Sequence, residues 1–141
     1  MEYISSSATE TKAIASKFAK NINAGDIIFL NGDLGFGKTT FVQGVAEYFN
    51  YTDPVRSPTY TFINTYKIKD KNIKQIVHID LYRINKSSEL TQLALEEYLN
   101  DESSVVFIEW PMKEVGDIIT KQYTSIKFEY LNNEERKIII N

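Results

Sequence analysis

A glycine-rich segment at residues 32–39 carries the strongest chemical signal in the sequence. It matches the phosphate-loop (P-loop) pattern G-x-x-x-x-G-K-[ST] at every fixed position and reads Gly32-Asp33-Leu34-Gly35-Phe36-Gly37-Lys38-Thr39. In such a loop the glycines let backbone N–H groups turn inward around a polyphosphate, and the helix that follows adds the positive end of its dipole. The pattern predicts that Lys38 reaches the β- and γ-phosphates of a nucleotide and that the Thr39 hydroxyl ligates magnesium.

The sequence on either side of this segment predicts the strand and the helix that a P-loop requires. Residues 27–30 are an apolar run of strand length, and Phe41 and Val45 recur at helical spacing after the loop. The dinucleotide pattern G-x-G-x-x-G is absent here, because the three glycines of the loop have the wrong spacing for it. A strand, a P-loop and a helix therefore follow one another, and a nucleotide is favoured over a dinucleotide cofactor.

Two acidic residues are candidates to complete a magnesium site. Glu109 ends the most hydrophobic predicted strand, and Asp80 ends another strand, which also carries the only histidine, His78. A nucleoside triphosphatase needs an acidic residue at a buried strand end to hold magnesium, directly or through water. Either carboxylate satisfies this; we favour Thr39 and Glu109 for magnesium and Asp80 for positioning or deprotonating an attacking water. Lys38, Asp80 and Glu109 are thus the candidate catalytic residues, and His78 is expected to support the site from the same strand face as Asp80.

The segment Ser57-Pro58-Thr59-Tyr60-Thr61 places hydroxyl groups beside a proline. It fits either a segment ordered by the γ-phosphate and magnesium or an ordinary turn before a strand. Arg56 and Arg83 are candidates to stabilise charge in a transition state, although surface arginines usually have no such role.

Composition limits the classes of site and partner. With 141 residues, 43% of them hydrophobic, residues 1–141 are expected to form a single domain. The absence of Cys and the presence of only 1 His exclude a disulfide-linked partner and zinc sites built from these residues, so a metal must be held by oxygen. A net charge of -3 gives no overall attraction for nucleic acid. The apolar runs are too short to span a bilayer, which predicts no membrane partner and a cytoplasmic protein.

Helical and strand patterns alternate along the chain. Ser7 followed by Glu10 resembles a capping box, and a helical stripe then continues through Ile22 until Gly25. Further helices are expected from Ser87 or Ser88 through Tyr98 and near 113–119, and further strands at 60–68, 73–80, 105–108, 123–130 and 136–140. We therefore expect an α/β fold: a P-loop NTPase-like mixed β-sheet with flanking helices and a C-terminal β-hairpin.

Taken in order, these elements resemble one protein family. The residues that carry the likeness are Gly32-Asp33-Leu34-Gly35-Phe36-Gly37-Lys38-Thr39-Thr40-Phe41, Ser57-Pro58-Thr59-Tyr60, His78-Ile79-Asp80-Leu81-Tyr82-Arg83 and Glu109-Trp110-Pro111. Their order and spacing resemble the TsaE (YjeE) family over almost the whole chain. Many NTPases share the P-loop, whereas the H-x-D-x-Y-R and E-W elements joined to it are specific to this family.

The resemblance implies a small bacterial ATPase needed to make threonylcarbamoyladenosine, the modified base beside the anticodon of tRNAs that read codons starting with A. It implies ATP and Mg2+ as cofactors and a TsaB-TsaD-like heterodimer as the partner. In such systems TsaC or a relative makes threonylcarbamoyl-adenylate, TsaD transfers the group to tRNA, and ATP hydrolysis by the TsaE-like subunit resets the complex. Contact with tRNA is then indirect, through the complex.

Position by position, the resemblance implies a triphosphate on Gly35, Phe36, Gly37, Lys38, Thr39 and Thr40, magnesium on Thr39 and Glu109, and a catalytic or switch role for Asp80 and Thr59. It also implies nucleotide contacts from Thr11 and Arg136. Phe36 is a departure, because the family commonly has Ala at this loop position.

Two other functions fit a P-loop. One is a kinase that passes the γ-phosphate to a small molecule or protein, although such enzymes usually have an Arg-rich lid and this sequence has no Arg cluster. The other is a nucleotide-dependent binding module whose hydrolysis is incidental. The sequence has no Asn-Lys-x-Asp element that would read guanine, which favours ATP.

Overall fold

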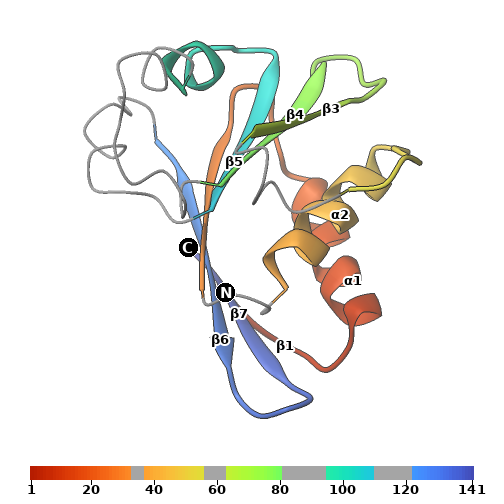
Figure 1. Cartoon of the computed structure of the whole chain (residues 1–141), viewed down its shortest axis with the longest axis vertical. Helices are drawn as coiled ribbons and strands as arrows, with labels where there is room; N and C mark the ends of the chain where they lie inside the picture. The colour runs from red at the N-terminus through yellow and green to blue at the C-terminus, as the bar shows by residue number, and fades with distance from the viewer. Residues whose placement is uncertain (33–36, 56–62, 81–94, 110–121) are drawn as a thin grey trace.

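The computed structural model describes residues 1–32, 37–55, 63–80, 95–109 and 122–141, and its centre is a seven-stranded mixed β-sheet (Figure 1). The helices and strands are β1 (Glu2–Ser5), α1 (Ala8–Ala19), β2 (Ile27–Asn31), α2 (Lys38–Tyr48), β3 (Ile63–Lys67), β4 (Gln75–Asp80), β5 (Ser104–Glu109), β6 (Thr124–Tyr130) and β7 (Arg136–Ile140). Residues 95–99 are also helical.

The strand order is β1-β7-β6-β2-β5-β4-β3. Strand β2 is parallel to its neighbours β5 and β6, and β4 is parallel to β5. The remaining pairs, β1 with β7, β3 with β4 and β6 with β7, are antiparallel. The predicted mixed sheet with a C-terminal hairpin is thus confirmed. Because parallel strands end at the same edge of a sheet, the ends of β2, β4 and β5 lie together there.

Helices α1 and α2 cover one face of the sheet (Figure 1). Strand side chains alternate between faces, so Ile28 and Leu30 of β2 join the core under these helices, whereas Ile27 and Phe29 point to the other face. The second core contains Leu95 and Leu99 of the 95–99 helix, together with Val77, Ile79, Val106 and Ile108. Every residue of β5 is buried, as expected for a central parallel strand with both faces covered.

Helix α1 begins as its sequence predicts and ends earlier. Ser7 is the N-cap, and its side-chain oxygen accepts a hydrogen bond from the Glu10 N–H at 3.0 Å. The Glu10 carboxylate reaches back to the N–H and hydroxyl of Ser6, and these hydrogen bonds lower its pKa from the ordinary value. The predicted stripe runs to Ile22, but the α-helix ends at Ala19 and Gly25 takes a φ of 90° before β2 begins.

The sequence did not predict β1, and several predictions lie outside the described residues. Strand β1 has 4 residues and forms by pairing with β7, from the other end of the chain. The strand predicted at 60–68 is confirmed over Ile63–Lys67, and the helix predicted to reach Tyr98 is confirmed over 95–99. The start of that helix and the one near 113–119 lie outside the described residues. Among the helices that the structure does describe, none has the length and apolar character needed to cross a membrane.

Candidate functional site

The N-terminus of α2 lies at the end of β2 and is built for an anion. Gly37 is the N-cap, with a φ of 95°, and as a glycine it has no side chain to cap the first turn. The first N–H groups of a helix have no partner within the helix, and together with the helix dipole they favour a negative ligand. Thr39 and Thr40 are half-buried in this turn. The residues predicted to bind phosphate from Gly37 to Thr40 therefore form the N-cap and first turn of α2, whereas Gly35 and Phe36 lie outside the described residues.

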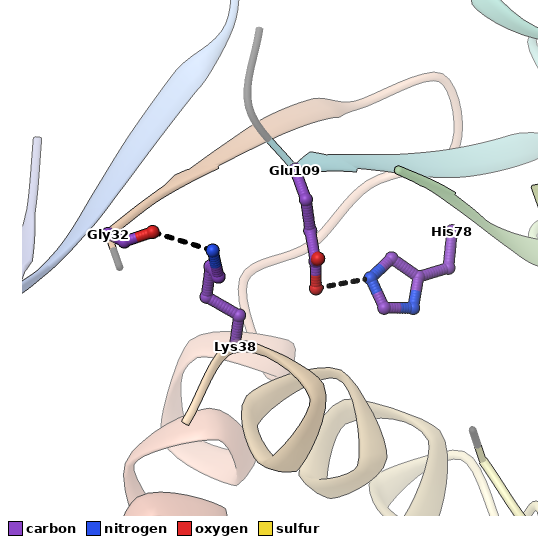
Figure 2. Close-up of polar contacts among 4 residues, drawn as sticks. All are labelled: Gly32, Lys38, His78 and Glu109. Carbon is purple, nitrogen blue, oxygen red and sulfur yellow. Dashed lines mark hydrogen bonds and ion pairs between the residues drawn. The ribbon is translucent and has the colours of Figure 1, made fainter. Parts of the chain in front are cut away.

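Lys38 is a buried cation at the start of α2. The residue is only 4% exposed, and its Nζ donates a hydrogen bond to the Gly32 carbonyl oxygen at 2.6 Å (Figure 2). A Cβ at Gly32 would lie 2.7 Å from the Phe128 carbonyl oxygen of β6, so only glycine fits between the loop and that strand. Burying an ammonium group is costly unless it meets acceptors, and phosphate oxygens are such acceptors.

The two predicted carboxylates lie side by side on the adjacent strands β4 and β5. Asp80 and Glu109 are paired in the register of these parallel strands, and Glu109 is also paired with Leu30 of β2. Paired side chains in adjacent strands point to the same face, and Leu30 belongs to the core beneath α1 and α2. Asp80 and Glu109 are 2% and 4% exposed. The fold therefore brings both carboxylates to the sheet face and the sheet edge where α2 begins.

His78 binds Glu109. Its Nε2 lies 2.9 Å from Glu109 Oε1, and the imidazole is fully buried (Figure 2). His78 and Asp80 share a face of β4, as predicted, but the hydrogen bond of the imidazole crosses to β5. Within the described residues, His78 Nδ1 has no hydrogen-bond partner.

Side-chain hydrogen bonds also hold the opposite end of the β4–β5 pair, where the two strands begin. Gln75 Nε2 donates to Ser104 Oγ at 3.0 Å, and Ser104 Oγ donates to Asp101 at 2.8 Å. Asp101 also accepts hydrogen bonds from the hydroxyl and N–H of Ser103, and together these contacts lower the pKa of Asp101 from the ordinary value. A lowered pKa means that the ionised carboxylate holds this turn at neutral pH and that the stabilisation is lost as the pH falls below the normal Asp range.

Thr11 and Arg136 lie beside Gly37. A Cβ on Gly37 would lie 3.1 Å from Arg136 Nη1 and 3.8 Å from Thr11 Cγ2. Thr11 is buried, and its hydroxyl is 2.7 Å from Ser5 Oγ. Since Ser5 Oγ donates its own proton to the Ser7 carbonyl, Thr11 is the donor to Ser5. Sequence reasoning missed Ser5, because its place here depends on the pairing of β1 with β7.

Several predicted residues lie outside the described part of the chain. They are the segment Ser57 to Thr61, which includes Thr59, together with Arg56, Arg83 and Trp110.

The donor chemistry of the site fits magnesium. In the described ranges no group of three or more His, Cys, Asp or Glu residues is placed to hold a metal ion. The protein oxygens at this edge of the sheet include those of Thr39, Glu109 and Asp80. Mg2+ prefers oxygen, keeps several waters and is commonly held by one or two carboxylates and substrate phosphates. Since Glu109 Oε1 is bound to His78, Oε2 is the oxygen that Glu109 offers.

Comparison with known proteins identifies the family. The family model described as "Threonylcarbamoyl adenosine biosynthesis protein TsaE" matches residues 5–138. The chain belongs to the TsaE family. This confirms the family resemblance of the sequence motifs and includes the chain in a family of proteins of tRNA threonylcarbamoyladenosine biosynthesis.

Individual TsaE proteins align with most of the chain. The "tRNA threonylcarbamoyladenosine biosynthesis protein TsaE" of Bacillus subtilis is 36% identical over 129 residues, which cover 92% of this chain and 77% of that protein. The protein of the same name from Rickettsia conorii is 35% identical over 131 residues, 92% of this chain and 71% of that one. The crystal structure of Bacillus subtilis YdiB is 30% identical and superposes with a TM-score of 0.76, covering 98% of this chain and 82% of that one.

Proposed function

We propose that this TsaE-family chain is a Mg2+-dependent ATPase. It serves the threonylcarbamoylation of the adenosine next to the anticodon of tRNA by acting on a TsaB-TsaD-like heterodimer. The observation that carries the ATPase proposal is the placement of the buried ammonium group of Lys38 at the start of α2, at the sheet edge where Asp80 and Glu109 are paired. Family membership supports the pathway. Contact with tRNA is indirect in this proposal, through the heterodimer.

Each side chain has a separate role. The N–H groups at the start of α2 bind the phosphates, and Lys38 supplies a positive charge to the β- and γ-phosphates. Thr39 and Glu109 hold magnesium, which when bound neutralises charge on the transferred phosphoryl group. Asp80 orients the attacking water and accepts its proton at the carboxylate. The burial of both carboxylates strengthens these electrostatic effects, because little water surrounds them.

Thr11 and Arg136 form the side of the proposed nucleotide site. They lie next to Gly37, where the loop enters α2. Arg136 supplies a guanidinium group that suits a phosphate oxygen, whereas the Thr11 hydroxyl donates its proton to Ser5 and offers only an acceptor. We propose ATP rather than GTP as the substrate because the sequence lacks an Asn-Lys-x-Asp element.

The test is Mg2+-dependent release of phosphate from ATP by the purified chain, alone and with the TsaB-TsaD pair from the same organism. We expect slow hydrolysis alone, stimulation by the pair, and loss of the stimulated rate in Glu109→Ala. Glu134→Ala is the matched control, since Glu134 is an exposed carboxylate in the β6–β7 turn. A hydrolysis rate that the TsaB-TsaD pair does not change would refute the proposed partner. Transfer of phosphate to an acceptor other than water would favour the kinase alternative.

A further inference from the structure

His78 is a buried polar side chain with an incomplete set of hydrogen bonds. It is 0% exposed, and of its two ring nitrogens only Nε2 has a partner within the described part of the chain. A buried polar atom that lacks a partner costs stability, so a residue chosen only for packing would be apolar here. The neighbours of His78 on β4, Val77 and Ile79, are indeed fully buried and apolar.

The sheet register explains why the imidazole reaches Glu109. On β4, His78 lies two residues before Asp80 and is paired with Phe107, two residues before Glu109 on β5. All four side chains point to the face that α2 covers. The imidazole therefore extends diagonally toward the strand ends and meets a Glu109 oxygen at 2.9 Å.

We propose that His78 is a positioning residue for the metal site and acts through Glu109. The inference rests on the proposed function. A glutamate side chain has three rotatable bonds, and the hydrogen bond from Nε2–H to Oε1 restricts them, leaving Oε2 as the oxygen that binds the metal. An ionised carboxylate only accepts hydrogen bonds, so Nε2 carries the proton.

Paired substitutions separate positioning from packing. His78→Leu keeps an apolar side chain of moderate size but removes the donor, whereas the amide nitrogen of His78→Gln can reach the place of Nε2. The measurement is Mg2+ titration of binding of a fluorescent, non-hydrolysable ATP analogue. We expect His78→Leu to weaken the apparent Mg2+ affinity about 10- to 100-fold, and His78→Gln to recover most of that loss. Binding of the analogue without Mg2+ should change less than about twofold in both variants, because in this proposal His78 acts on the metal through Glu109 and not on the phosphates.

Unchanged Mg2+ dependence in His78→Leu, or an equal loss in both variants, would overturn the positioning role. Failure of the unmutated chain to bind the analogue at all would instead overturn the proposed function.

A second measurement needs no substitution at His78. The chain has only 1 His, so the ring signals in a ¹⁵N NMR spectrum belong to this residue alone. We expect a proton on Nε2, and a changed Nε2 signal in Glu109→Ala but not in Glu134→Ala. A ring protonated on Nδ1 alone would overturn the hydrogen bond and the positioning role with it, whether or not nucleotide binds.

Discussion

Lys38 places a positive charge in the protein interior, where little water surrounds it. We therefore expect its substitution to weaken nucleotide binding more than that of any other single residue of the site. Its Nζ is 2.6 Å from the Gly32 carbonyl oxygen. A charge-assisted hydrogen bond to phosphate contributes about 1.5–3 kcal/mol, so Lys38→Ala should weaken ATP binding at least about tenfold. Calorimetric titration with the ATP analogue measures this. Lys17→Ala removes an exposed charge elsewhere on α1 and should bind normally. Equal affinity of Lys38→Ala and the unmutated chain would refute the P-loop assignment.

At this scale the sequence predicts residue types better than their contacts. The P-loop pattern and the strand ends give Lys38, Asp80 and Glu109 directly, because each is defined by neighbours along the chain. The His78–Glu109 hydrogen bond could not be predicted, because its residues are 31 positions apart. Spacing along β4 relates His78 only to Asp80; its contact on β5 depends on the strand order, which no local pattern contains.

Among the elements, α1 and α2 pack so closely that the contact leaves no room for a side chain at Gly44. Gly44 of α2 faces α1, and a Cβ there would lie 2.8 Å from both Ala15 Cβ and Lys12 Cα. Overpacking typically costs about 1–3 kcal/mol, and Gly→Ala in a helix recovers up to about 1 kcal/mol. We expect Gly44→Ala to lower the melting temperature by about 3–6 °C in a thermal unfolding scan.

A double-mutant cycle tests whether the helix contact is the cause. Ala15→Gly removes one of the two close atoms, so Gly44→Ala should cost less in the Ala15→Gly background than alone. Purely additive effects of the two substitutions, or a stabilising Gly44→Ala, would contradict the packing explanation.

The hydrophobic pattern of the sequence predicts most strands of the sheet but not β1. Strand β7 has the predicted bounds, and β2, β4, β5 and β6 differ from theirs by one or two residues, because each has a strong apolar pattern. Strand β1 lacks such a pattern: Ile4 is 59% exposed, and the strand exists because β7 offers it a partner. Pairing between the two ends of a chain is a tertiary effect that local sequence does not encode.

At the scale of the whole molecule, the strand order brings residues that are far apart in the sequence to one edge of the sheet. Strands β1 and β7 and helix α1 place Ser5, Arg136 and Thr11 on one side of Gly37, while β4 and β5 bring Asp80 and Glu109 to the other end of the same sheet edge. The N-terminal ammonium group donates to the Ile140 carbonyl oxygen at 2.9 Å, so the two chain ends are adjacent. A nucleotide in the proposed site contacts residues from both halves of the chain and should therefore stabilise the molecule as a whole.

Because the proposed site draws on both halves of the chain, we predict that nucleotide binding raises the melting temperature. A ligand at 100 times its dissociation constant stabilises the folded state by about 2.7 kcal/mol, which for a chain of this length raises the melting temperature by roughly 5–10 °C. We expect such a rise with the non-hydrolysable ATP analogue and Mg2+, a much smaller one in Lys38→Ala at the same concentrations, and a full one in Lys17→Ala. Hydrogen exchange should slow in β7 and β4 together, because both lie at the site although they belong to opposite halves of the sheet. Protection confined to the start of α2 would mean that the loop binds phosphate without engaging the flanking strands.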